Sequence, residues 1–354
     1  MRRAFRRIGA ALGLLAGLAI LAACQPPAAQ RVTNTPGGAA PAAGGTSLPA
    51  VSERLKVAWV SASGSYLPFW AGIDLGLFQK WGLEVEPVFT SGPQAVQSLL
   101  AREVDIAYTD GAAIVRAALA GGDTVILGST TNVFPFRVIG VPSLQRVEDL
   151  RGKRLGITRQ GATTDTAARS LLRRVGLQPD VDVALIQTGT TTEMYSALVA
   201  GAIDAGVMSE PVALQAIKDG YRVLFDMANM GVEYPTTALG TLRSLVAERP
   251  AALRAFIAGL TEAIARVRQN RAEALEVLAR FTRLEDPEVL NATYDEFAPR
   301  YPQAPYPTEA SIVTILESIR ELEGRTIDAR PSDFIDPRFV RELDESGVIR
   351  SFYP

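Results

Sequence analysis

Gly82–Asp110 reads GLEVEPVFTSGPQAVQSLLAREVDIAYTD, and Gly176–Glu210 reads GLQPDVDVALIQTGTTTEMYSALVAGAIDAGVMSE. Both stretches contain an apolar strand, a small polar turn, an amphipathic helix and a second strand that begins around an aspartate, Asp105 or Asp204. Such a unit needs a neighbour to bury its apolar face. Two copies in one chain therefore predict two similar α/β lobes with a cleft between them.

The chain has the composition of an ordinary globular protein. Its 354 residues are 47% hydrophobic and 21% charged, enough for one large or two medium domains with real cores. The formal net charge of −2 includes four arginines that we expect to be removed with the N-terminal segment: Arg2, Arg3, Arg6 and Arg7. Without them, about 32 basic residues face 38 acidic ones, a net charge of roughly −6. An acidic protein without a basic stripe is not expected to bind nucleic acid.

Two residue types are missing or nearly so. The sequence contains no histidine and one cysteine, Cys24. An imidazole base, a histidine-based triad and a histidine metal site are therefore excluded. Because Cys24 lies in the targeting segment, the folded part is expected to lack a disulfide, a thiol nucleophile and a cysteine zinc site. We therefore predict no catalytic residue, no metal and no cofactor.

Residues 1–23 have the pattern of a lipoprotein signal peptide. Four arginines precede an apolar run that ends in Leu-Ala-Ala-Cys at Leu21–Cys24, which resembles the bacterial lipobox with its lipidated cysteine. Residues 24–52 are rich in Pro, Ala, Gly, Thr and Ser and are predicted to form a disordered tether. The protein is thus expected at the extracytoplasmic face of the cell envelope, held to the membrane through a lipid on Cys24 alone. The alternative is a plain secreted protein in which Cys24 is incidental.

From Arg54 onward, strands alternate with helices, which favours parallel sheets with right-handed crossovers. Expected strands lie at 55–60, 84–89, 105–108, 124–128, 154–158, 183–187, 203–208 and 221–225, and expected helices at 67–81, 93–103, 111–120, 163–175, 191–201 and 210–219. The strand at 136–141 is expected to leave the first lobe, and extended residues 234–246 to return to it. Lobe I is then 54–140 plus 235–354, including further C-terminal helices, and lobe II is 141–234. A double hinge near residues 140 and 235 would join them.

Candidate ligand contacts in the first lobe come from one rule about parallel sheets. Ligands meet the carboxyl ends of the strands, where helix N-termini present free N–H groups. The rule selects Tyr66, Ser91, Gly92, Tyr108 and Asp110. Tyr66 is a candidate to stack on a flat ligand, and Ser91 with Gly92 to let the backbone approach a ligand oxygen. Simple helix capping explains Ser91 equally well, and Asp110 either receives a ligand amine or caps the helix at Gly111.

In the second lobe, the same rule selects a loop and a carboxylate. Gly161, Thr163 and Thr164 would place hydroxyls and backbone N–H groups at a positive helix end, although Asp165 on the first turn opposes an anion there. Glu210 suits a ligand amine, or it only stabilises the helix that follows. A further candidate, Arg137, lies at the predicted crossover. It pairs either with an anionic ligand or with a carboxylate across the hinge.

Several segments resemble the solute-binding proteins of ABC importers, specifically the group that binds nitrate, sulfonates and taurine and includes binders of thiamine pyrimidine precursors. The resemblance covers about residues 54–330 and is carried by PFWA at Pro68–Ala71, Gly76–Phe78, Gly82–Val85, Leu100–Ala107, Leu150–Gly156, Gly201–Ala205 and Glu210-Pro211. The C-terminal Asp336–Leu343 resembles the same family. It implies a type II periplasmic-binding-protein fold, a monomer whose lobes close over the ligand, and ABC permease and ATPase partners. It also implies that the loop 158–165 contacts the ligand.

The sequence therefore predicts a lipid-anchored solute-binding protein rather than an enzyme. Enzymes on the same scaffold, resembling a pyrimidine synthase or a desulfinase, rely on histidine or cysteine, which the folded part lacks. A third possibility is a ligand-sensing module for a receptor. The ligand stays open between two classes. The Thr/Gly loop favours a sulfonate or nitrate, whereas the aromatic and carboxylate candidates favour a thiamine-precursor-like pyrimidine.

Overall fold

The computed structural model describes residues 52–324 and 326–354. The predicted signal peptide, Cys24 and the tether up to residue 51 lie outside these residues. No helix in the described part of the chain is long and apolar enough to cross a membrane.

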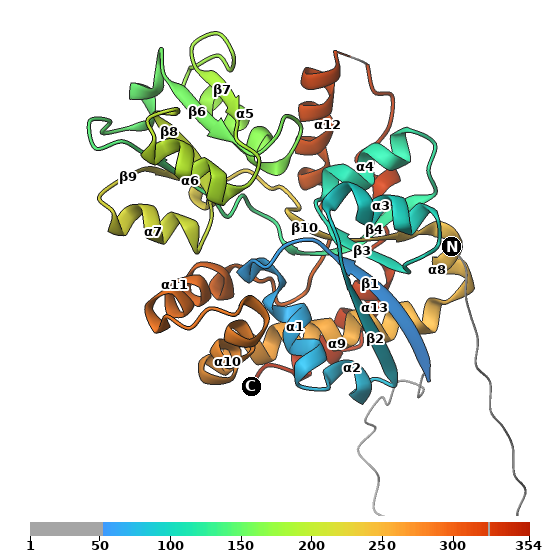
Figure 1. The fold of residues 1–354 in the computed structure, drawn as a ribbon. Coiled ribbons are helices and arrows are strands. Elements are labelled where there is room, and N and C mark those ends of the chain that lie inside the picture. Colours follow the sequence, from blue (N-terminus) through green and yellow to red (C-terminus); the bar gives the residue numbers. More distant parts are fainter. Residues whose placement is uncertain (1–51, 325) are drawn as a thin grey trace, which may run out of the picture. The chain divides into compact units, whose positions relative to one another are not determined.

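The first sheet has the strand order β2-β1-β3-β10-β4. Its strands are β1 (Glu53–Trp59), β2 (Leu83–Phe89), β3 (Ile106–Thr109), β4 (Thr124–Thr131) and β10 (Thr237–Leu242). β1 pairs in parallel with β2 and β3, whereas β10 runs antiparallel between β3 and β4 (Figure 1). The extended segment expected to return the chain to the first lobe is therefore an internal strand of this sheet.

The second sheet repeats this arrangement in the order β7-β6-β8-β5-β9. Its strands are β5 (Arg137–Gly140), β6 (Arg154–Ile157), β7 (Ala184–Gln187), β8 (Ala205–Met208) and β9 (Arg222–Asp226). β5 runs antiparallel between β8 and β9, as β10 does in the first sheet. The prediction of two similar α/β lobes is confirmed, with one antiparallel strand in each sheet rather than purely parallel sheets.

The antiparallel strand β5 corrects one predicted boundary. Residues 137–140 were expected to be the last strand of lobe I, but they pair with β8 and β9 of the second sheet. An apolar run indicates that a strand is buried, but its hydrogen-bonding neighbours are far away in sequence and leave no local signal.

Fourteen α-helices surround the sheets in the described residues: α1 (Leu67–Asp74), α2 (Leu77–Lys80), α3 (Gly92–Leu100), α4 (Gly111–Leu119), α5 (Thr163–Arg174), α6 (Thr191–Val199), α7 (Val212–Lys218), α8 (Arg243–Glu248), α9 (Pro250–Gln269), α10 (Arg271–Thr282), α11 (Pro287–Phe297), α12 (Glu309–Glu323), α13 (Arg338–Glu345) and α14 (Val348–Ser351). The single helix predicted over 67–81 is divided into α1 and α2. Gly76 adopts φ 67° between them, a conformation that glycine reaches without strain.

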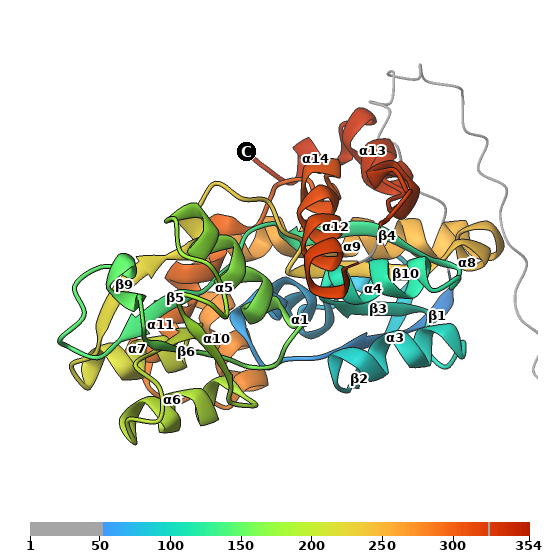
Figure 2. The ribbon, with the colours of Figure 1, turned by 90° about the horizontal axis from the view of Figure 1, so that it is seen from above.

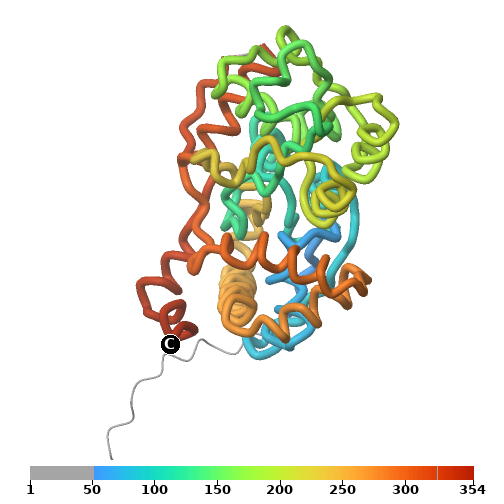
Figure 3. Tube along the Cα trace, turned by 90° about the vertical axis from the view of Figure 1, so that its left-hand side faces the viewer, coloured from blue at the N-terminus to red at the C-terminus, as the bar shows by residue number. Residues whose placement is uncertain are grey.

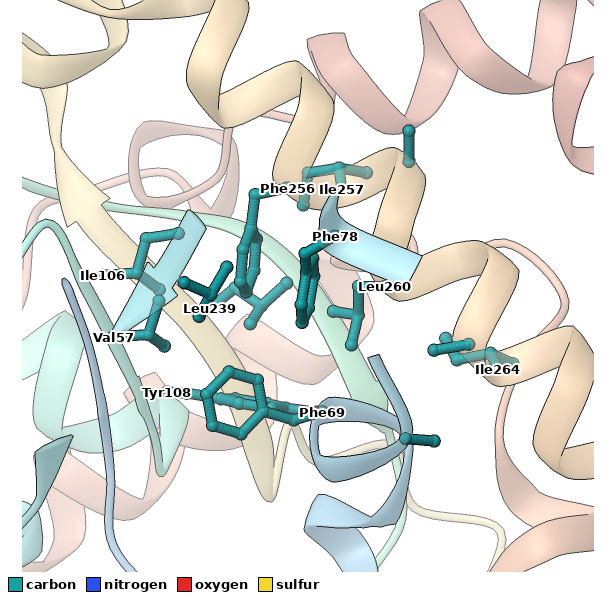
Figure 4. Close-up of a cluster of buried hydrophobic side chains, with 14 of the residues drawn as sticks. Val57, Phe69, Phe78, Ile106, Tyr108, Leu239, Phe256, Ile257, Leu260 and Ile264 are labelled. Carbon is teal, nitrogen blue, oxygen red and sulfur yellow. The ribbon is translucent and has the colours of Figure 1, made fainter. Parts of the chain in front are cut away.

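The core of the first lobe joins the N-terminal helices to the long helix α9. Phe78 of α2 stacks on Phe256 of α9 with ring centroids 5.0 Å apart, and Phe69 of α1 meets Tyr108 of β3 edge-on at 5.7 Å (Figure 4). All four side chains are buried. Full burial of one such side chain contributes about 1.5–3 kcal/mol. This packing joins α2 to α9 and α1 to β3.

A second hydrophobic cluster contains residues of both lobes. It includes Ile114 of α4, Leu171 of α5 and Ile315 of α12, and it also includes Phe134 and Tyr234 from the two segments that connect the sheets. The rings of Phe134 and Tyr234 stack with centroids 4.5 Å apart, so the two crossings pack against each other. Views from above and from the side place α12 near α4 and α5 (Figures 2 and 3). The two connections between the sheets thus pack against each other, the first of them at Phe134 rather than near residue 140 as predicted.

Candidate binding site

The carboxyl ends of β2 and β3 bring the first turn of α3 beside a buried threonine. Gly92 carries the first amide of α3, and Pro93 after it has no N–H. Ser91 caps this helix together with Gln94, whose side-chain oxygen accepts from the Ser91 hydroxyl at 2.9 Å. A Cβ added to Gly92 would lie 3.5 Å from the Thr109 Oγ1. The open face of Gly92 and the Thr109 hydroxyl therefore border the same space.

The Thr109 hydroxyl is buried and, in the described part of the chain, has no hydrogen-bond partner. Thr131 and Thr237, which face each other where β4 ends and β10 begins, also carry buried hydroxyls without a partner among the described residues. All three threonines lie at the same edge of the first sheet, since β10 runs antiparallel to β3 and β4. A buried polar group without a partner costs about 1–3 kcal/mol. Buried polar groups of this kind need an explanation, and one explanation is that a bound ligand supplies the missing hydrogen bond.

Asp110 caps α4 and also bonds to Tyr234 of one connecting segment and to Thr163 of α5. Its carboxylate accepts from the Ala112 N–H at 2.7 Å and from the Tyr234 hydroxyl at 3.0 Å, and Thr163 at the start of α5 donates a third hydrogen bond. Burial raises the pKa of Asp110, and the hydrogen bonds from Thr163 and Ala112 oppose that shift. Of the two predicted roles for Asp110, the structure contains the helix cap. The structure also contains the hydrogen bond from Thr163 to Asp110, which joins the two lobes and which the sequence pattern did not indicate.

Several polar groups of the predicted anion loop in the second lobe bond to other groups of the protein. The Gly161 N–H donates to Asp165 Oδ2 at 2.7 Å, and the Gly161 carbonyl accepts from Arg116 at 3.2 Å. The Thr164 hydroxyl oxygen accepts from the Thr158 N–H at 3.0 Å and is buried. Two carboxylates of the chain, Asp165 and Asp110, thus bond to the Gly161 N–H and to the Thr163 hydroxyl beside the start of α5, where an anionic ligand was predicted to bind.

Arg137 and Glu210 are brought together by the second sheet. Arg137 begins β5, Glu210 follows the neighbouring strand β8, and their side chains form an ion pair. Glu210 is 3% exposed, and its second oxygen accepts from the Leu214 N–H at 2.8 Å. Because both residues belong to the second sheet, this ion pair lies within one lobe and is not the predicted pairing across the hinge.

A second buried carboxylate, Glu296 of α11, also pairs with Arg137, and sequence analysis missed it. Arg300, one helical turn further along, binds the same carboxylate at 3.0 Å. Burial raises the pKa of Glu296, while Arg137 and Arg300 oppose this. Since α11 packs on the first-lobe helix α10, the Arg137–Glu296 pair connects the lobes. No local pattern could have found it, because the partners lie 159 residues apart.

Tyr66 and Tyr108 lie inside the first lobe rather than on its surface. The Tyr66 hydroxyl donates to the Tyr108 carbonyl at 3.2 Å, and the Tyr108 hydroxyl bonds to Thr130. Both side chains are buried, and burial raises the pKa of each hydroxyl. Their contacts are those of core residues, so a ligand role for either stays a prediction.

The paired aspartates of the repeated units have equivalent structural roles. Asp105 Oδ2 accepts from the Lys56 N–H at 2.8 Å, and Asp204 Oδ2 accepts from the Arg154 N–H at 2.8 Å. Each carboxylate thus ties the start of its strand to the neighbouring parallel strand, β1 for Asp105 and β6 for Asp204.

We expect Asp204→Ala to lower the free energy of unfolding by about 1–2 kcal/mol, since it removes hydrogen bonds to a charged group. Arg154 holds the pKa of Asp204 below its usual value, so this stabilisation is present above the unfolded pKa and is lost as pH falls through the folded one. Urea unfolding at several pH values measures the effect. An equal loss for the Asp204→Ala variant at acid and neutral pH would contradict the assignment.

Comparison with known proteins identifies the family. Residues 49–281 match the model of the NMT1-like family. The chain belongs to this family. A binding protein of Brucella abortus is 29% identical over 217 residues, and the match spans 60% of this chain and 66% of that relative, just under two thirds of its length.

Solved structures share the fold. The periplasmic aliphatic sulphonate binding protein SsuA of Escherichia coli superimposes with a TM-score of 0.65 at 20% identity, covering 81% of this chain and 91% of that one. The periplasmic nitrate-binding protein NrtA of Synechocystis gives a TM-score of 0.66 at 18% identity, covering 87% and 92%. The predicted periplasmic-binding-protein fold and the family resemblance are therefore both confirmed.

Proposed function

We propose that this protein is the solute-binding component of an ABC importer and captures a small sulfonate- or nitrate-type anion. The observation that carries the proposal is the buried Thr109 hydroxyl, unpartnered in the described part of the chain, beside the first turn of α3. A hydroxyl donor and the first amide of a helix together suit an oxyanion, because the helix N-terminus carries partial positive charge. The names of the two solved relatives, for sulphonate and for nitrate, support the same ligand class.

The ligand contacts that we propose lie mainly in the first lobe. Gly92 and Thr109 would bind the oxyanion, with Ser91 shaping the turn. Asp110 and Thr163 would close the site from the two sides. The remaining second-lobe candidates already have partners within the protein: Gly161 and Thr164 bond to loop residues, and Glu210 pairs with Arg137.

Two direct contacts between the lobes suit a closing mechanism. Thr163 bonds to Asp110, and Arg137 bonds to Glu296. A solute that adds contacts to both lobes would shift the population further toward the closed form, which a permease and its ATPase would then recognise. We further propose that the mature chain acts as a monomer at the extracytoplasmic face, held by a lipid on Cys24.

A thiamine-precursor-like pyrimidine fits the site less well. An aminopyrimidine needs an acceptor for its amino group, and Asp110 is the carboxylate at the strand end of the first lobe. Asp110 already accepts from Ala112, Tyr234 and Thr163, so little of its capacity remains.

The test is a thermal and calorimetric panel with methanesulfonate, taurine, nitrate and an aminopyrimidine. A solute present at 100 times its Kd should raise the free energy of unfolding by about 2.7 kcal/mol. We expect this shift with at least one anion. If the aminopyrimidine stabilises the protein and none of the anions does, the ligand is a pyrimidine and not a sulfonate or nitrate.

A further inference from the structure

Three aromatic side chains lie in register across the first sheet. Trp59, the last residue of β1, pairs with Phe89 of β2 on one side and with Tyr108 of β3 on the other. Side chains in register on parallel strands project from the same face of a sheet. The row runs from the buried Tyr108 through the half-buried Trp59 to Phe89, whose exposed fraction is 63%.

Trp59 is held in place from the core side. Its ring meets Trp70 edge-on at 5.5 Å and Tyr66 at 6.1 Å, and Trp70 in turn stacks on Phe281 at 5.3 Å with an interplanar angle of 7°. Phe89 lies against Trp59 with centroids 4.6 Å apart. A rigid aromatic base therefore supports an outer ring that the core does not cover.

Phe89 stands out among the exposed side chains. Six large hydrophobic residues are exposed in the described part of the chain, and the other five are aliphatic: Leu100, Val181, Val199, Val223 and Val313. Single exposed apolar residues are common and need no explanation. Phe89 differs because it sits on a preformed aromatic base, at the carboxyl end of a strand, where ligands of such sheets bind.

The aromatic row and the anion site lie at the same end of the first sheet, the carboxyl ends of β2 and β3, although Tyr108 and Thr109 project from opposite faces of it. The Thr90 N–H donates to the Trp59 carbonyl at 3.0 Å, and Gly92 follows Phe89 by three residues. Three residues of extended chain span at most about 10 Å. Phe89 and Gly92 thus lie close together, and a small molecule lying over the carboxyl ends of the strands would reach both of them.

We propose that Phe89 and Trp59 bind an aromatic substituent of the solute, so that the preferred ligand is an aryl-substituted organic anion such as an arylsulfonate. This inference rests on the proposed anion-binding function and narrows its substrate class. Ring–ring contact favours offset or edge-on packing, and it adds to the free energy gained by covering the exposed face of Phe89.

The experiment compares benzenesulfonate with methanesulfonate by isothermal titration calorimetry on the purified full-length protein in detergent. We expect the wild type to bind benzenesulfonate about five- to tenfold more tightly. Phe89→Ala should lose this preference and leave methanesulfonate affinity unchanged, whereas Phe89→Tyr should keep it. Val181→Ala, which shortens an exposed side chain of the second lobe, is the matched control and should change neither affinity.

The outcomes separate the two proposals. Equal affinity for both sulfonates in the wild type, or an unchanged preference in Phe89→Ala, would overturn the aromatic assignment and leave the anion-binding function standing. If neither sulfonate nor nitrate binds the wild type, the proposed function fails and the aromatic assignment fails with it.

Discussion

Replacing Arg137 with alanine is expected to lower the free energy of unfolding by about 3–5 kcal/mol, because it leaves buried carboxylates without their partner. Glu210 and Glu296 each have side chains only 3% exposed, and both pair with Arg137. Ionised carboxylates in such a site are costly unless they are paired and hydrogen-bonded. In the variant, Arg300 still binds Glu296, so the part of the stability loss that comes from Glu296 should lie at the lower end of this range.

Urea unfolding of the wild type and of Arg137→Ala measures the effect. The matched control is Arg146→Ala, since the Arg146–Glu148 pair is exposed on both sides and should contribute less than about 1 kcal/mol. Similar small losses in both variants would show that the cluster around Arg137 does not stabilise the fold.

The loss caused by Arg137→Ala should depend on pH in a defined direction. Burial raises the pKa of Glu296 and Arg137 opposes that shift, so the pKa is higher still in the variant. A carboxyl group with a raised folded pKa binds its proton more readily in the folded state, and stability therefore grows as pH falls through that pKa. The deficit of the variant should be largest near pH 7 and should shrink in mildly acidic buffer. A deficit that grows on acidification would contradict this account.

Thr109→Val should weaken sulfonate binding by about tenfold to a hundredfold, because a hydrogen bond to a charged group contributes about 1.5–3 kcal/mol. Valine keeps the shape of threonine and removes only the hydroxyl. Since that hydroxyl is buried and lacks a partner among the described residues, its removal should leave the unfolding free energy unchanged or slightly raised. Loss of binding without loss of stability is the signature of a ligand contact.

Calorimetry with the tightest anion of the panel measures this effect. Thr109→Ser retains the hydroxyl and should retain most of the affinity. Thr314→Val is the control, because Thr314 lies on α12 and its hydroxyl bonds to the Ala310 carbonyl at 3.3 Å. Wild-type affinity in Thr109→Val would remove Thr109 from the site and with it the main support for the proposed function.

The local elements of the fold could be read from residue pattern. Helix α4 begins where Asp110 predicts, because a capping carboxylate acts within a few residues. The break at Gly76 was missed. The apolar pattern continues across it, and only the positive φ of Gly76 separates α1 from α2.

The candidate site could be predicted only in part. The carboxyl-end rule selected Asp110 and Thr163, which the structure joins. It also selected Glu210, which pairs with Arg137, a candidate chosen for its place at the predicted crossover. It also selected Tyr66 and Tyr108, which the structure buries, because a residue at a strand end can face either the core or the ligand side.

By itself the sequence determined three things: the two similar α/β lobes, the family, and the absence of histidine and of all but one cysteine, which removes many catalytic mechanisms. Repeats, short motifs and missing residue types are all properties of the chain. Tertiary structure alone decided which sheet receives β5, that Glu296 joins Arg137, and that the Thr109 hydroxyl stays unpartnered among the described residues. The physical reason is the distance along the chain over which each kind of interaction acts. Caps and periodicity act over a few residues, whereas strand pairing, burial and ion pairs are settled between groups that meet only when the chain has folded.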